Sequence, residues 1–206
     1  MGNADIGQGV KHETSFLRIH FFQLLPENRA QRLNDQVSID LGGIAKGYAV
    51  DQVAAHLEAG DIRDYMVEIG GELRIKGHNA KGIPWQIAIE EPDPAKRAVQ
   101  RLIEITDEGI ATSGDYRNFF EHEGQRYSHE IDPLTGWPVR HKLASVTVVN
   151  KSCMRADAFA TALFVMGPEK GFDLAEQEHL AVFFIIISND DFQEKMTSEF
   201  KQYLVK

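Results

Sequence analysis

Residues Asp107 to Val139 read DEGIATSGDYRNFFEHEGQRYSHEIDPLTGWPV, and they set the architecture expected for the rest of the chain. The stretch holds two glycine-punctuated turns, the hydroxyl pair Thr112 and Ser113, a central His129, and an Asp-Pro-Leu-Thr-Gly turn that begins at Asp132. Glycine amides and hydroxyls in such number suit a site that surrounds phosphate oxygens. They are equally typical of two ordinary hairpins, so this stretch alone leaves both interpretations open.

On both sides of this stretch, short apolar runs follow one another directly, and helical periodicity is confined to a few longer segments. Adjacent strands favour antiparallel or mixed sheets with helices packed on one face, which is an α+β fold. We expect strands at 15–25, 37–41, 65–69, 72–76, 85–89, 102–105, 109–111, 144–149 and 181–187, a hairpin over 116–131 with its turn at 123–124, helices at 44–59, 155–166, 169–178 and 197–204, and a loop at 26–36.

Composition restricts the kinds of partner. The chain has 206 residues, enough for one large domain or two small ones, and a formal net charge of −9. With no long basic cluster, this charge argues against direct binding to nucleic acid or an anionic membrane. A polyanionic small ligand would need local positive groups or a metal ion.

Two further features limit the chemistry and the location. The single cysteine, Cys153, permits no internal disulfide and is expected to be a small buried residue rather than a catalytic thiol. The longest apolar run, Leu180 to Ile187, is too short to span a bilayer and reads as a buried strand. The N-terminal residues carry no recognisable export signal.

The segment DLGGIAKGYAVD, Asp40 to Asp51, places two glycines before a helix. The first turn of a helix presents backbone amides and a positive dipole end to an anion. Lys46 lies in that turn, where its ammonium can reach a phosphate. In the alternative interpretation, the glycines only permit close packing of the backbone, and the side chain of Lys46 is solvated.

The segment Gly70-Gly71-Glu72 lies between two expected strands. A hairpin turn or bulge is the simpler interpretation. The alternative is a close approach of the backbone to a planar ligand.

A third candidate is Asp157-Ala-Phe-Ala-Thr161, which lies on an otherwise small or apolar helix. Asp157 and Thr161 are four residues apart and therefore share a helix face. A carboxylate and a hydroxyl beside alanines leave room for a hard cation such as magnesium. Asp157 also lies near the start of its helix and can simply interact with the helix dipole, so both interpretations stand.

Taken in series, five segments resemble the ApbE family, the FAD:protein FMN transferases. They occur in the family's order within residues 37–188 and read DLGGIAKGYAVD (Asp40 to Asp51), VEIGGELRIKG (Val67 to Gly77), IATSGDYRNFF (Ile110 to Phe120), YSHEIDPLTGWPV (Tyr127 to Val139) and ADAFATALFVMG (Ala156 to Gly167). The resemblance implies a T-fold-like α+β architecture that binds FAD. It also implies magnesium-dependent transfer of FMN to a Thr or Ser hydroxyl of an acceptor flavoprotein, with release of AMP.

The resemblance also implies roles for individual residues. The residues implied to hold magnesium are Asp157, Thr161 and the carbonyl of Ala45, and His129 is the implied catalytic base. Those implied to contact FAD or its phosphates are Lys46, Thr112 and Ser113, with Gly70, Gly71 and Glu72 on the flavin side.

Family members usually carry a long N-terminal region before the DLGGIAKG segment, and residues 1–36 do not match it. We therefore divide the chain into an unmatched segment, 1–36, and a flavin transferase-like domain, 37–206. The implied acceptors are subunits of redox-driven ion pumps, and the implied location is periplasmic with a lipid anchor, or alternatively cytoplasmic. An FAD-binding or flavin-trafficking protein and an FAD pyrophosphatase are the alternative functions.

Overall fold

The computed structural model describes residues 21–93, 98–115, 119–122, 125–188 and 191–205. The chain forms two compact units. The larger comprises residues 41–119 and 141–206, and the smaller comprises residues 1–40 and 120–140. The boundary predicted between residues 36 and 37 is not tested by this division and stays a prediction.

The larger unit is built on a six-stranded sheet in which every neighbouring pair is antiparallel. Its strand order is β12 (Asp191–Met196), β11 (Ala181–Ser188), β10 (Leu143–Asn150), β7 (Gly109–Gly114), β4 (Glu72–Lys76) and β3 (Tyr65–Ile69).

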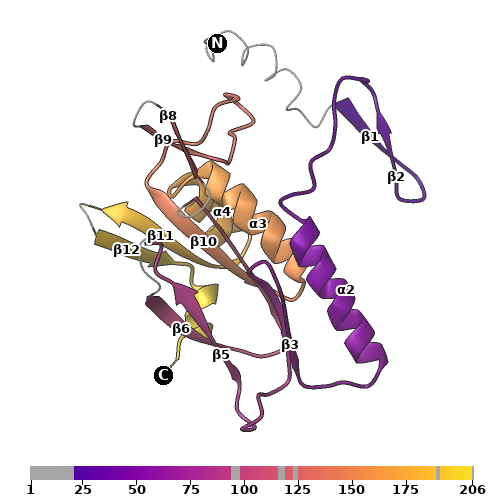
Figure 1. Ribbon diagram of the computed structural model, residues 1–206, viewed down its shortest axis with the longest axis vertical. Helices are drawn as coiled ribbons and strands as arrows, with labels where there is room; N and C mark the ends of the chain where they lie inside the picture. Colours follow the sequence, from indigo (N-terminus) through magenta and orange to yellow (C-terminus); the bar gives the residue numbers. More distant parts are fainter. Residues whose placement is uncertain (1–20, 94–97, 116–118, 123–124, 189–190, 206) are drawn as a thin grey trace. The chain divides into compact units, whose positions relative to one another are not determined.

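Helices cover one face of this sheet, and a hairpin covers the other (Figure 1). The helical layer consists of α2 (Ala45–Ala59), α3 (Cys153–Met166) and α4 (Lys170–Gln177). On the opposite face lie the paired strands β5 (Trp85–Glu90) and β6 (Val99–Ile105), with the short 3-10 helix η3 (Glu199–Tyr203). The predicted α+β class, with antiparallel sheets and helices on one face, is therefore confirmed.

Strands β10 and β11 are buried on both faces over most of their length because they lie between these layers. Strand β10 is buried from Leu143 to Val149, and β11 is buried from Ala181 to Ile185. Their side chains are mainly β-branched or aromatic, which suits a pleated surface packed on both sides. Helix α3 begins at Cys153, two residues before the predicted start, and the Ser152 hydroxyl caps it by accepting a hydrogen bond from the Arg155 amide.

The smaller unit contains two hairpins and a tight turn. Strand β1 (Phe22–Leu25) pairs with β2 (Arg29–Arg32), and β8 (Phe119–His122) pairs with β9 (Gln125–Ser128). The predicted turn at Asp132 is present: the Gly136 amide donates to the Asp132 carbonyl at 2.7 Å, and the Asp132 carboxylate accepts from the Leu134 amide. The turn expected at residues 123–124 lies outside the described residues, as do residues 15–20 of the first expected strand.

Two predictions at the start of the chain are wrong. The expected loop at 26–36 contains strand β2, whose side chains are all exposed, so no hydrophobic alternation marks it. The expected strand at 37–41 is not formed. The Val37 amide instead bonds to the Asn34 carbonyl, and the Val37 carbonyl accepts from Arg32, so this segment folds back onto the hairpin end.

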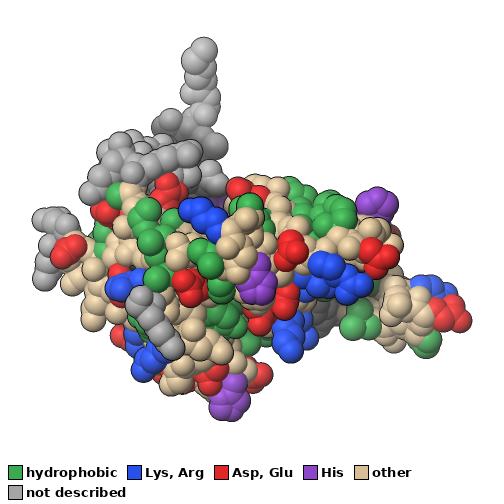
Figure 2. All heavy atoms as spheres, turned by 90° about the horizontal axis from the view of Figure 1, so that it is seen from below, with side chains coloured by type: hydrophobic (Ala, Val, Ile, Leu, Met, Phe, Trp, Pro, Cys, Tyr) green, Lys and Arg blue, Asp and Glu red, His purple; other side chains and the backbone are tan. Residues whose placement is uncertain are grey.

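At the other end, the polar strand β12 was not predicted, and the expected helix at 197–204 is the shorter η3. Acidic and basic side chains are interspersed over the face drawn in Figure 2. Within the described residues, no helix combines the length and apolar character needed to cross a membrane.

Candidate functional site

The start of α2 and the start of α3 approach each other so closely that backbone meets backbone. A Cβ placed on Gly47 would lie 2.4 Å from the Cys153 carbonyl oxygen, and one on Gly109 would lie 2.6 Å from the Cys153 nitrogen. Only a hydrogen fits at either position, since real Cβ atoms do not approach backbone at these distances. This contact fixes α3 beside the first turn of α2 and against β7.

Asp51 reinforces the same junction from α2. Its carboxylate accepts hydrogen bonds from the Cys153 amide at 3.0 Å, the Met154 amide at 3.1 Å and the Ser152 hydroxyl at 2.8 Å. These donors belong to the N-terminal turn of α3 and its cap, where backbone amides have no partner within the helix. Asp51 therefore anchors the start of the helix that carries Asp157 and Thr161.

Asp157 lies on α3 and is 3% exposed. Its Oδ2 accepts a hydrogen bond from the Gly47 amide at 3.0 Å, in the first turn of α2. Asp157 thus interacts with the positive end of the neighbouring helix rather than only with its own helix. Within the part of the chain that the structure describes, no lysine or arginine pairs with it.

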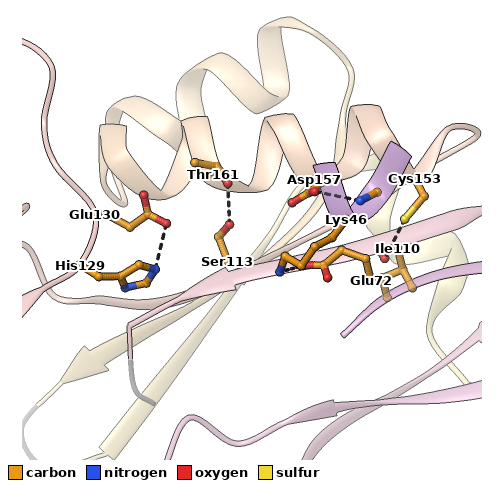
Figure 3. Close-up of polar contacts among 10 residues, drawn as sticks. Lys46, Glu72, Ile110, Ser113, His129, Glu130, Cys153, Asp157 and Thr161 are labelled. Atoms are coloured by element: carbon orange, nitrogen blue, oxygen red, sulfur yellow. Dashed lines mark hydrogen bonds and ion pairs between the residues drawn. The ribbon is translucent and has the colours of Figure 1, made fainter. Parts of the chain in front are cut away.

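Thr161 follows one turn later on the same face of α3, as the four-residue spacing predicts. Its hydroxyl lies 3.1 Å from the Ser113 hydroxyl on β7. A Cβ on Gly43 would lie 3.2 Å from both Cγ2 and Oγ1 of Thr161, so the backbone before α2 packs directly on this side chain. Asp157 and Thr161 thus both contact the segment 43–47, which contains Ala45 (Figure 3).

Lys46 points from the first turn of α2 to Glu72 on β4, with its Nζ 2.6 Å from Oε1 (Figure 3). Glu72 is 2% exposed, and its other carboxylate oxygen, Oε2, is buried without a hydrogen-bond partner among the described residues. Burial raises the pKa of Glu72, and the negative charge of Asp157 adds to the rise, whereas Lys46 opposes it.

The glycine pair before Glu72 forms the turn of the β3–β4 hairpin, in which Ile69 pairs with Glu72. Gly70 has φ +63° and Gly71 has φ +101°, in the left-handed region that favours glycine. The hairpin interpretation is therefore confirmed. A contact of Gly70 and Gly71 with a flavin stays a prediction.

The hydroxyls of Thr112 and Ser113 leave β7 on opposite faces of the sheet. Ser113 faces α3 through its contact with Thr161, whereas Thr112 lies 2.8 Å from the Thr147 hydroxyl on the next strand. Alternation along a strand dictates this separation. Of the pair, Ser113 lies beside Thr161, and a contact of Thr112 with phosphate stays a prediction.

Cys153 is a buried packing residue, as expected. It is fully inaccessible, and burial raises the pKa of its thiol to about 12. Nearby carboxylates, first that of Asp51, contribute to the rise. A thiolate is disfavoured in such surroundings.

His129 belongs to the smaller unit and is exposed in the loop after β9. Its Nε2 lies 3.4 Å from Oε1 of Glu130, a neighbour that the sequence did not single out (Figure 3). The carboxylate of Asp132, three residues further on, accepts hydrogen bonds from the Leu134 amide and the Thr135 hydroxyl. The role of His129 as a base stays a prediction.

The oxygen donors on α2 and α3 fit a hard divalent cation. Asp157 is buried without a basic partner among the described residues, and Thr161 and Ala45 offer a hydroxyl and a carbonyl. Magnesium prefers such neutral and anionic oxygens. Among the described residues there is no group of three or more His, Cys, Asp or Glu that could hold a metal, and one carboxylate with a hydroxyl and a carbonyl would not form such a group.

Three residues of this junction, Gly43, Gly47 and Asp51, were not among the predicted site residues. All three lie within or at the end of the segment 40–51, and Asp51 follows Gly47 by one helical turn. That spacing is the signal that could have placed Gly47 and Asp51 on one face of α2. Their partners on α3 lie about 100 positions further along the chain and leave no local signal.

Comparisons with known proteins point to one family. A family model described as the ApbE family matches residues 6–184. The FAD:protein FMN transferase of Vibrio cholerae is 53% identical over 171 residues, which cover 83% of this chain and 51% of that protein. The protein of the same name from Haemophilus influenzae is 51% identical over 168 residues, covering 81% of this chain and 49% of the relative.

Solved structures agree. The flavin transferase ApbE from Vibrio cholerae superposes with a TM-score of 0.87 at 43% identity, covering 98% of this chain and 65% of that one. The apo flavinyl transferase ApbE from Pseudomonas stutzeri gives a TM-score of 0.82 at 39% identity, covering 94% of this chain and 59% of the other. The chain spans about half the length of the curated relatives that it matches.

Proposed function

This chain belongs to the ApbE family, and from this membership we propose that it transfers FMN from FAD to a Thr or Ser hydroxyl of an acceptor flavoprotein, with release of AMP. The observation that carries the proposal is its 53% identity to a FAD:protein FMN transferase over 83% of the chain. The cluster of Lys46, Asp157 and Thr161 at the α2–α3 junction adds chemical support, because it combines a cation with hard oxygen donors.

The phosphates of FAD are proposed to bind at the start of α2. Lys46, whose side chain is 47% exposed, supplies an ammonium, and Ser113, on the face of β7 that packs against α3, supplies a hydroxyl. Such groups suit phosphate oxygens because each donates a hydrogen bond, and the ammonium also adds a positive charge. The flavin is proposed to lie over the turn formed by Gly70 and Gly71.

Asp157, Thr161 and the Ala45 carbonyl are proposed to hold a magnesium ion. When bound, the ion would offset the negative charge that develops on the phosphoryl oxygens during transfer. This chain contributes the placement of the donors: the Gly47 amide orients the Asp157 carboxylate, and Ser113 and Gly43 fix Thr161.

His129 is the proposed base. Its imidazole takes the proton of the acceptor hydroxyl as the hydroxyl oxygen attacks the phosphorus that carries riboflavin. The bond from that phosphorus to the bridging oxygen of the pyrophosphate breaks, so the bridging oxygen leaves with AMP, and the proton passes to solvent or to the departing AMP. The products are an FMN phosphodiester on the acceptor and free AMP.

We propose that the acceptor is a subunit of a redox-driven ion pump and that the reaction takes place in the periplasm. Both assignments rest on family membership. A fusion of this chain to a reporter enzyme that is active only after export would test the location.

AMP release distinguishes this function from the alternatives. Purified protein is incubated with FAD and magnesium, with and without an acceptor subunit, and the nucleotides are separated by chromatography. Release of AMP only with the acceptor supports transfer. Steady release of AMP and FMN without acceptor would identify an FAD pyrophosphatase, and tight FAD binding without AMP would identify a binding or trafficking protein.

A further inference from the structure

A lysine that binds phosphate must be held in place, and in this chain the group that holds Lys46 is buried. Glu72 is 2% exposed, yet its carboxylate bonds to the half-exposed ammonium of Lys46 at 2.6 Å. A buried carboxylate with one unpartnered oxygen is a poor source of stability, because the cost of removing it from water is not fully offset. Its placement therefore calls for a reason other than stability.

The hairpin turn beside Glu72 is shaped around the same lysine. A Cβ on Gly70 would lie 3.1 Å from Cδ of Lys46 and 3.6 Å from Oε2 of Glu72. The stem of Lys46 therefore passes along the bare backbone of Gly70 before it reaches Glu72. The turn and the carboxylate together leave the ammonium one defined position.

A second carboxylate acts on this pair. The charge of Asp157 adds to the rise in the pKa of Glu72 that burial causes, and Asp157 has no basic partner among the described residues. In protein kinases an analogous Lys–Glu ion pair must form before the lysine can act on phosphates.

We infer that Glu72 is a positioning residue: it holds Lys46 beside the β3–β4 turn and aims the remaining N–H donors of the ammonium at a phosphate-bearing ligand. An ammonium has three donors, and one is directed at Glu72 Oε1. This role differs from the flavin contact implied for Glu72 by resemblance, since a side chain that is 2% exposed offers little surface to a flavin. The claim that Lys46 binds a phosphate-bearing ligand rests on the proposed function. The claim that Glu72 positions Lys46 does not.

The first test needs no flavin. Surface amines of the ligand-free protein are acetylated with a water-soluble ester, and the rate at each lysine is read by peptide mass spectrometry. Glu72→Gln should accelerate labelling of Lys46 alone, because the ammonium loses its charged partner. The matched control is Glu58→Gln, which removes the acid of the 2.7 Å Lys76–Glu58 pair and should accelerate Lys76 but not Lys46. An unchanged rate at Lys46 would overturn the inference whatever the protein does with FAD.

The second test measures ligand affinity. Glu72→Gln should weaken the binding of FAD and of ADP by about tenfold or more, which is the loss expected for a charge-assisted hydrogen bond. It should leave the binding of riboflavin unchanged, because riboflavin lacks phosphate. Lys46→Met should weaken the binding of FAD and ADP to a similar extent. The double variant should bind them no more weakly than Lys46→Met alone, because Glu72 acts through Lys46. Equal weakening of riboflavin, or additive losses in the double variant, would contradict the inference.

Glu72→Asp provides a second variant should Glu72→Gln fail to fold, because it keeps the charge but is one methylene too short to reach Lys46. It should accelerate Lys46 acetylation in the same way. If the wild-type protein bound neither FAD nor ADP, the proposed function would fail, whereas the acetylation rates would still decide whether Glu72 positions Lys46.

Discussion

Asp51 and Asp157 each cap the other's helix. Asp51, on α2, accepts hydrogen bonds from the first amides of α3, and Asp157, on α3, accepts one from the Gly47 amide in the first turn of α2. Each carboxylate lies at the positive end of the helix dipole opposite it. This exchange locks the two helices together at the point where the proposed ligand-binding groups meet.

Asp51→Asn should destabilise the protein by about 1–3 kcal/mol, because a charged acceptor for two backbone amides and a hydroxyl is replaced by a neutral one. Urea denaturation measures the change. The exposed Asp61→Asn should leave the midpoint unchanged. Equal midpoints for Asp51→Asn and wild type would show that the exchanged caps contribute nothing to stability.

Gly47→Ala should be more damaging than Gly60→Ala at the other end of the same helix. The new methyl would lie 2.4 Å from the Cys153 carbonyl oxygen, so the backbone of α3 must move, at a cost of about 1–3 kcal/mol or more. Gly60→Ala is the control, because its nearest neighbour is 3.4 Å away and its φ is −90°. It should be neutral or stabilising by up to about 1 kcal/mol. A similar thermal midpoint for both variants would contradict the close approach.

His141 should make the larger unit sensitive to acid. Burial lowers the pKa of His141, and its ring packs edge-on against Phe164, so the folded state disfavours the protonated form. The unfolded chain takes up the proton first, so stability should fall as the pH drops below about 6.5. Thermal melts are measured between pH 8 and pH 5, about one and a half units either side of that value. The slope of the thermal midpoint against pH should be smaller for His141→Asn than for the wild type.

His141→Asn retains an acceptor for the Leu143 amide, which bonds to Nδ1 at 3.3 Å in the wild type. The exposed His56→Asn serves as the matched control and should keep the wild-type slope. Identical slopes in all three proteins would remove His141 as a source of acid sensitivity.

His129→Ala should leave FAD affinity nearly intact and slow the chemical step by about two to four orders of magnitude, the usual contribution of a positioned base. Single-turnover kinetics with saturating FAD and acceptor measure this step. Glu130→Gln keeps the imidazole and should have a smaller effect. Turnover of His129→Ala at the wild-type rate would show that another group removes the proton of the acceptor hydroxyl.

Periodicity and capping residues were sufficient to predict the interior of the fold. Strand β10 is β-branched from Val146 to Val149, β11 is β-branched or aromatic from Val182 to Ile187, and α3 is bounded by Ser152 and Gly167. Strand β2 was missed because RAQR is exposed on both faces and is held by backbone pairing alone. Val37 to Leu41 has the composition of a strand but no neighbouring strand to pair with among the described residues.

The candidate site was predictable wherever one element alone decides the geometry. The four-residue spacing of Asp157 and Thr161 fixes their common face, and strand alternation separates Thr112 from Ser113. The contacts that give the site its charge balance join distant segments: Lys46 meets Glu72 26 positions away, and Asp157 meets Gly47 110 positions away. Only tertiary packing determines those pairs.

Intact-mass spectrometry of an acceptor flavoprotein subunit tests the proposed transfer most directly. The subunit is incubated with this chain, FAD and magnesium, and Asp157→Ala and the Vibrio cholerae relative are run in parallel. The account predicts that the acceptor gains the mass of one FMN phosphodiester, that one AMP appears for each acceptor modified, and that Asp157→Ala gives neither. An acceptor of unchanged mass, in a reaction where the relative modifies it fully, would contradict the account.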